Sequence, residues 1–117
     1  DVDMRAVEAK SQMLCSIFIA QVEEHCSRYG LRLAGPREMS QRGSHVSFHC
    51  PQGYAVMQAL IAAGVVGDFR APDLIRFGFT PLYTSHAEVF DAAAVLLKIL
   101  RDGDWNRPEF LARKAVT

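Results

Sequence analysis

The sequence lacks an excess of charge of either sign. Its 117 residues include 13 Lys and Arg and 13 Asp and Glu, so the formal net charge is zero. Proteins that bind nucleic acid through phosphate contacts usually carry a basic excess on one face. We therefore expect no nucleic-acid partner.

Long hydrophobic runs are also missing, although 50% of the residues are hydrophobic. A membrane-spanning helix needs about 20 consecutive apolar residues, and the apolar stretches of this chain are interrupted well before that. The N-terminus does not have the charged and then apolar segments of a signal peptide. We expect a soluble, cytoplasmic protein with no membrane partner.

Cysteine is scarce and unpatterned. Cys15, Cys26 and Cys50 are odd in number and lack metal-site spacing, which argues against a disulfide framework and a zinc site. His45 and His49 lie near Cys50, but alternation along a strand places Cys50 on the opposite face. We predict reduced thiols and no metal ligands.

Motifs of nucleotide binding and nucleophilic catalysis are absent as well. The eight glycines are scattered and form neither a GxGxxG nor a Walker pattern, so a phosphate-binding loop is not expected. No elbow motif or activated-cysteine setting indicates a nucleophile.

The hydrophobic pattern predicts four helices, the first of them long. Glycines at positions 30 and 64 are typical stops for the first two helices. Ser85 and Glu88 have capping-box spacing at the start of the third helix. Asn106 is the expected N-cap of the last helix, with proline in its first turn. The predicted helices are residues 5–29, 54–63, a segment from about 86 to 100, and a short segment that reaches about Lys114.

Four short runs have the composition of strands, namely residues 31–33, 45–50, 65–70 and 74–79. The last two are separated by Ala-Pro-Asp, which predicts an antiparallel hairpin. The order is helix, strand, strand, helix, strand, strand, helix, helix. It predicts one α+β domain over residues 1–117, a two-layer sandwich in which helices cover a mostly antiparallel sheet.

One predicted strand contains an arginine among apolar residues, in the segment DLIRFGFTPLY at residues 73–83. Successive side chains of a strand point to opposite faces. Ile75, Phe77 and Phe79 therefore share one face, and Arg76 lies on the other. A guanidinium stays charged and is costly to bury unpaired, so we expect an anionic partner for Arg76.

Two kinds of partner fit Arg76. The first is an ion pair within the protein, with Asp68 across the hairpin or with Asp73. The second is the carboxylate of a ligand, for which a flat guanidinium offers two parallel hydrogen bonds that lysine cannot match. The residues by themselves leave both interpretations open.

Residues 30–96 resemble the C-terminal small domain of the bacterial kynureninase family. The motifs that carry the resemblance are RGSHVSF at residues 42–48, GDFRAPD at residues 67–73 and RFGFTPLY at residues 76–83. The similarity extends more loosely over the first helix and over RPEF at residues 107–110.

The resemblance implies a fold type I enzyme that depends on pyridoxal phosphate. As a homodimer, this enzyme hydrolyses kynurenine to anthranilate and alanine in tryptophan degradation. In the family, the large domain holds the cofactor through a lysine, and the small domain contributes an arginine to the substrate α-carboxylate. Arg76 occupies the matching strand, so the resemblance implies that it binds substrate. We interpret Arg42, His45 and His49 as structural, at the contact with the large domain, and Tyr83 as a packing residue.

The chain departs from the family in lacking the large domain. Its three lysines, Lys10, Lys98 and Lys114, fall in predicted helices, and none has a setting like that of the cofactor lysine. We therefore expect no cofactor in this chain. We interpret the chain, which begins at Asp1 instead of methionine, as the separated C-terminal domain of a longer enzyme, inactive by itself.

A second interpretation is a free-standing α+β module that binds a ligand or dimerises without catalysis. A domain separated from a larger enzyme is expected to expose an apolar patch, whereas an evolved module is not.

Overall fold

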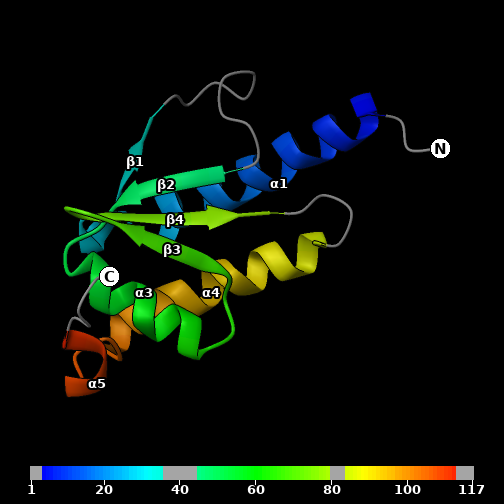
Figure 1. Ribbon diagram of the computed structural model, residues 1–117. Coiled ribbons are helices and arrows are strands. Elements are labelled where there is room, and N and C mark those ends of the chain that lie inside the picture. Colours follow the sequence, from blue (N-terminus) through cyan, green and yellow to red (C-terminus); the bar gives the residue numbers. More distant parts are fainter. Residues whose placement is uncertain (1–3, 36–44, 80–83, 113–117) are drawn as a thin grey trace.

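Helices and strands alternate along the chain in the predicted order (Figure 1). The computed structural model describes residues 4–35, 45–79 and 84–112. The helices are α1 (Met4–His25), the 3-10 helix η1 (Ser27–Tyr29), α3 (Gly53–Ala62), α4 (His86–Asp102) and α5 (Pro108–Leu111). The strands are β1 (Arg32–Ala34), β2 (His45–His49), β3 (Gly67–Arg70) and β4 (Leu74–Gly78). Among the described helices, none combines the length and the apolar character needed to cross a membrane.

The four strands form one antiparallel sheet in the order β1-β2-β4-β3. Strands β3 and β4 form the predicted hairpin, with Asp68 directly opposite Arg76. The chain crosses from β2 to β3 through α3, and β4 lies between these two strands, so Ser47 of β2 is the other neighbour of Arg76. The α+β prediction is confirmed.

The helices pack on one face of the sheet (Figure 1). Phe18 of α1 is fully buried at the centre of the interface between the helices and the sheet. Its ring lies 4.6 Å from that of Phe77, 5.1 Å from that of Phe79 and 6.2 Å from that of Phe48, measured between centroids. Ile75 is also fully buried. The predicted apolar face of β4 is therefore the face that packs against the helices.

The start of α4 and the end of α3 have the capping contacts that the sequence predicts. Ser85 Oγ accepts a hydrogen bond from the Glu88 backbone N–H, and the Glu88 carboxylate accepts one from the Ser85 N–H, both at 3.1 Å. After α3, Gly64 has φ +92° and its N–H donates to the Ile61 carbonyl, while Val65 N–H donates to that of Leu60. This is a Schellman ending. The Val65 N–H is part of this helix ending and is not available to the sheet. Strand β3 begins at Gly67 and not at residue 65 as predicted.

Three helix boundaries differ from the prediction. The first helix ends at His25 and gives way to the 3-10 turn η1, after which Gly30 adopts a left-handed conformation with φ +90°. In α5 the N-cap is Arg107, not Asn106, because the residue before a proline is driven out of the helical region and Pro108 takes the first helical position. Helix α5 ends at Leu111, and Lys114 lies outside the described residues.

Candidate functional site

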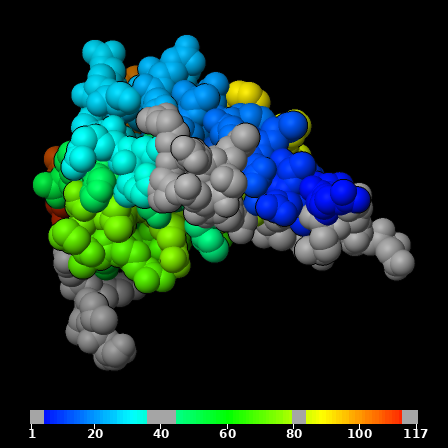
Figure 2. Space-filling model, turned by 90° about the horizontal axis from the view of Figure 1, so that it is seen from above, coloured from blue at the N-terminus to red at the C-terminus, as the bar shows by residue number. Residues whose placement is uncertain are grey.

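The face of the sheet opposite the described helices carries polar side chains, and we call it the open face. Because alternate residues share a face, it includes Arg76 of β4, Ser47 of β2 and Asp68 of β3, which lie at one level across three strands. Figure 2 shows the yellow-green surface of the β3 and β4 hairpin exposed near the cyan surface of β1.

The Arg76 guanidinium is held by Asp68. Nε donates to Oδ1 of Asp68 at 3.1 Å, and Nη2 donates to Oδ2 at 2.7 Å. The side chain of Arg76 is 31% exposed and that of Asp68 is 46% exposed. The predicted ion pair within the protein is thus present with Asp68. The contact uses the side of the guanidinium formed by Nε and Nη2 and does not use Nη1.

Asp73, the other predicted partner, is paired elsewhere. Its carboxylate oxygen lies 3.0 Å from Nδ1 of His49, and its backbone carbonyl accepts a hydrogen bond from the Cys50 N–H at 2.9 Å. The turn residue therefore fastens the start of β4 to the end of β2. His49 thus contacts the β3–β4 turn, and the role predicted for it at the contact with the large domain stays a prediction.

A second arginine lies beside the ion pair. Nε of Arg70 is 3.9 Å from Oδ1 of Asp68, and the Arg70 side chain is 59% exposed. Two arginines share one aspartate, so this part of the open face carries one net positive charge. An anion that approaches Arg76 is therefore attracted, even though Asp68 already neutralises one arginine.

Residues of β2 lie beside Arg76 on the side opposite Asp68. Ser47 is directly opposite, and the ring of His45 lies over Gly78, where an added Cβ would be 3.3 Å from Cδ2 of His45. A glycine at position 78 leaves room for this ring. Sequence reasoning did not identify Ser47 as a neighbour of Arg76, because strand periodicity gives the face of a residue but not its partner strand.

The cysteines do not contribute a reactive group. Cys15, Cys26 and Cys50 are free and buried. Burial raises the pKa of the Cys26 thiol to about 11. Burial, with smaller contributions from the charges of Asp73 and Cys26, raises the pKa of the Cys50 thiol to about 12. These thiols are protonated at neutral pH, and no group of three potential metal ligands occurs in the described ranges.

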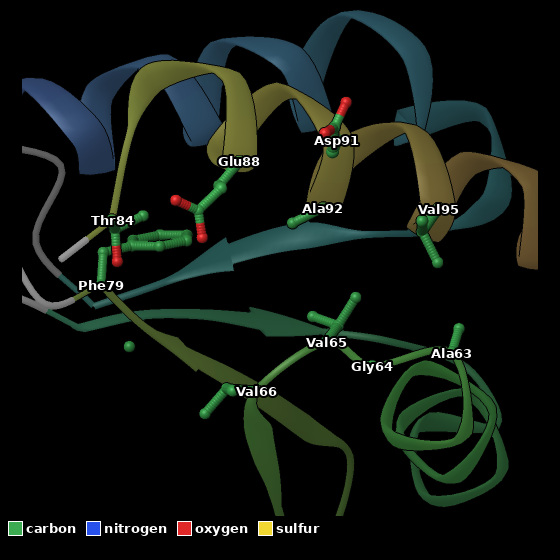
Figure 3. Close-up of a pocket in the computed structure, with 11 residues that line it drawn as sticks. Ala63, Gly64, Val65, Val66, Phe79, Thr84, Glu88, Asp91, Ala92 and Val95 are labelled. Carbon is green, nitrogen blue, oxygen red and sulfur yellow. The ribbon is translucent and has the colours of Figure 1, made fainter.

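A cleft of about 330 Å³ lies between α4 and the segment that joins α3 to β3 (Figure 3). Val65, Val66 and Val95 contribute apolar lining, and Phe79 and Glu88 lie at one end. The Glu88 carboxylate already accepts the capping hydrogen bond from Ser85. The carboxylates of Glu88 and Asp91 line the cleft as well, so it is unsuited to an anion, and Arg76 on the open face remains the stronger candidate for recognition of an anionic ligand.

Comparison with known proteins identifies the chain's relatives. The family model described as "Kynureninase C-terminal domain" matches residues 7–96. The chain belongs to the kynureninase C-terminal domain family. The match includes every strand of the sheet and the Arg76 site.

Curated kynureninases are similar over nearly the whole chain. It is 50% identical to the kynureninase of Pseudomonas fluorescens and 52% identical to that of Burkholderia mallei (strain SAVP1), each over 115 residues that make up 98% of this chain. The kynureninase of Burkholderia pseudomallei (strain K96243) is also 52% identical. The chain spans 28% of the length of these relatives, which are enzymes, and corresponds to their C-terminal part.

Two predicted structural residues, Arg42 and Tyr83, lie outside the described residues. Within the described part of the kynureninase motifs, His45 borders Gly78 and His49 contacts Asp73. Among the described motif residues, Arg76 has a cationic group that is held by two hydrogen bonds and partly exposed on the open face.

Proposed function

We propose that this chain is the substrate-carboxylate side of a kynureninase that depends on pyridoxal phosphate and hydrolyses kynurenine to anthranilate and alanine. The observation that carries the proposal is the oriented, partly exposed guanidinium of Arg76 in a chain of the kynureninase C-terminal domain family. The complete enzyme would be a cytoplasmic homodimer, with this domain packed against its own large domain.

The chemistry of Arg76 suits an α-carboxylate. A guanidinium has five N–H donors, and Asp68 accepts from Nε and Nη2. The end formed by Nη1 and Nη2 then offers one N–H from each nitrogen, in parallel, to a second carboxylate. A hydrogen bond to a charged group contributes about 1.5 to 3 kcal/mol, which corresponds to one to two decades of affinity. Arg76 would bind and orient the substrate and would not exchange protons with it.

The cofactor would supply the electron sink for carbon–carbon cleavage, and the described lysines do not fit the role of holding it. Nζ of Lys98 donates to Asp104 at 2.8 Å and lies 3.5 Å from Asp102. The Asp104 carboxylate raises the pKa of Lys98, whereas a lysine that bonds to a carbonyl must lose its proton. Lys10 lies in α1, away from the open face. We propose that the cofactor is held by the part of the enzyme that this chain does not match.

Several apolar side chains of the described residues are exposed and are available to pack against further protein. Val66 is 80% exposed, and Met13, Ile61, Phe90 and Leu111 are each between 42% and 50% exposed. Burial of such side chains stabilises an interface by about 25 cal/mol per Å² of apolar surface. The comparisons give no support to the alternative of a free-standing module.

A chimera tests the proposal. This chain replaces the matching C-terminal 28% of the Pseudomonas fluorescens kynureninase, and the purified protein is assayed for anthranilate release. We expect activity, and we expect Arg76→Lys to raise the KM for kynurenine about 10- to 100-fold while kcat falls less, because a carboxylate contact is lost.

The matched control is Arg32→Lys, the same substitution at an exposed residue of β1, which should leave KM unchanged. Gel filtration and cofactor absorbance check that each chimera is assembled. An Arg76→Lys chimera with the kinetics of the parent would contradict the proposed role. The isolated chain, mixed with pyridoxal phosphate and gel filtered, should retain no cofactor absorbance and show no turnover.

A further inference from the structure

We propose that Asp68 is a positioning residue of the carboxylate site, which holds the guanidinium of Arg76 by one side so that its end is presented to the ligand. The inference rests on the proposed function of Arg76 and adds a second residue to it. Asp68 does not touch the ligand in this arrangement, and it acts through Arg76.

The geometry of the pair fixes the plane of the guanidinium. The two hydrogen bonds, Nε to Oδ1 at 3.1 Å and Nη2 to Oδ2 at 2.7 Å, are parallel and prevent rotation about the last bonds of the arginine side chain. They take two of the five donors. The remaining donors are the two on Nη1 and one on Nη2, and the described residues give them no recorded partner.

The backbone beneath the pair is also closely fixed. Asp68 and Arg76 are directly opposite in the β3 and β4 ladder. Gly67, which precedes Asp68, packs so tightly that an added Cβ would lie 2.7 Å from the Arg76 carbonyl oxygen. The two side chains therefore start from directly opposite backbone positions of two closely packed, hydrogen-bonded strands. An arginine that is already ordered loses less conformational freedom when it binds a ligand.

Electrostatics by itself predicts that Asp68 weakens the binding of a ligand carboxylate, whereas positioning predicts that Asp68 strengthens it. Its carboxylate is negative and close to the place where the ligand carboxylate would bind, so removal of its charge should strengthen anion binding. Positioning predicts that removal weakens binding, because the freed guanidinium samples several rotamers. The sign of the change in KM separates the two accounts.

The test uses Asp68→Asn in the kynureninase chimera described above. Asparagine keeps the size of the side chain but accepts through only one oxygen, so the two-point contact is lost. We expect KM for kynurenine to rise about three- to tenfold, as for the release of one ordered long side chain, with kcat changed less than twofold. Asp91→Asn, which makes the same change at an exposed residue of α4, should leave KM unchanged.

A double-mutant cycle shows whether Asp68 acts through Arg76. In the Arg76→Lys background, Asp68→Asn should add less than a twofold change, since lysine offers no planar group to orient. An unchanged or lowered KM for Asp68→Asn, or an equal increase in both backgrounds, would overturn the inference. If Arg76→Lys itself leaves KM unchanged, the proposed function fails. If only Arg76→Lys raises KM, the proposed function stands and the role of Asp68 is refuted.

A second variant covers the case in which Asp68→Asn does not assemble. Asp68→Glu keeps the charge and both oxygens but moves them by one methylene group. If orientation is what matters, Asp68→Glu should raise KM by less than Arg76→Lys does, and an increase as large as that for Arg76→Lys would contradict positioning.

Discussion

Replacement of Gly67 by alanine tests the close pairing of β3 and β4 beneath Arg76. The added Cβ would lie 2.7 Å from the Arg76 carbonyl oxygen, 3.0 Å from Cε of Met57 and 3.2 Å from its Sδ. The methionine side chain can move away, but the carbonyl oxygen belongs to the central strand β4. The strands must therefore separate at this position or the backbone must distort.

The expected cost follows from two opposing effects. Overpacking of a tightly packed site costs about 1 to 3 kcal/mol. Alanine also restricts the unfolded chain more than glycine does, which returns about 0.4 to 1 kcal/mol. We expect Gly67→Ala to lower the free energy of unfolding by about 1 to 2 kcal/mol. With a urea m-value of about 1 to 3 kcal/mol/M, the midpoint of unfolding should fall by about 1 M.

Gly78→Ala is the matched control in the neighbouring strand. Its Cβ would lie 3.3 Å from Cδ2 and 3.5 Å from Nε2 of His45, an exposed side chain that can rotate. We expect a change within about 0.5 kcal/mol, as at other tolerant surface positions. Urea unfolding of the chain, followed by circular dichroism, measures both variants. A Gly67→Ala chain as stable as the parent, or less affected than Gly78→Ala, would refute the packing argument.

Two further predictions concern a helix cap and the buried thiols. Ser85→Ala removes the side-chain half of the α4 capping box and should cost about 0.5 to 2 kcal/mol in the same urea assay, whereas an unchanged midpoint would show that the cap is dispensable. Because burial raises the pKa of Cys26 to about 11 and of Cys50 to about 12, above the ordinary thiol pKa of 9.0, the unfolded state loses these protons first. Stability should therefore fall as pH rises from about 9 toward 11. This slope should be weaker in the Cys26→Ala/Cys50→Ala chain, and an identical slope in both chains would contradict the assignment.

Local features of the fold were predictable because their physical causes lie close together in the sequence. Alternation in β4 identified the buried face of Phe77 and the opposite face of Arg76, and both assignments are confirmed. The capping box at Ser85 and the helix stop at Gly64 are also confirmed, since each depends on residues within about five positions. The error at the start of β3 arose where the hydrogen bonds of the helix ending extend past α3, and the error at the start of α5 arose from the geometry of the residue before proline.

The family match of the chain was likewise apparent from motifs in the sequence, and the comparisons bear it out. The sequence left Asp68 and Asp73 as equal partners for Arg76. The tertiary structure decided between them, because the hairpin register places Asp68 opposite Arg76 and the end of β2 brings His49 to Asp73. It also placed Ser47 beside Arg76.

The sequence by itself therefore determined which elements form, which face of β4 is apolar and to which family the chain belongs. Only the tertiary structure decided which described residues surround Arg76 and which edge of its guanidinium Asp68 occupies. The physical reason is that periodicity and capping act within one element, whereas strand order and register join residues far apart along the chain.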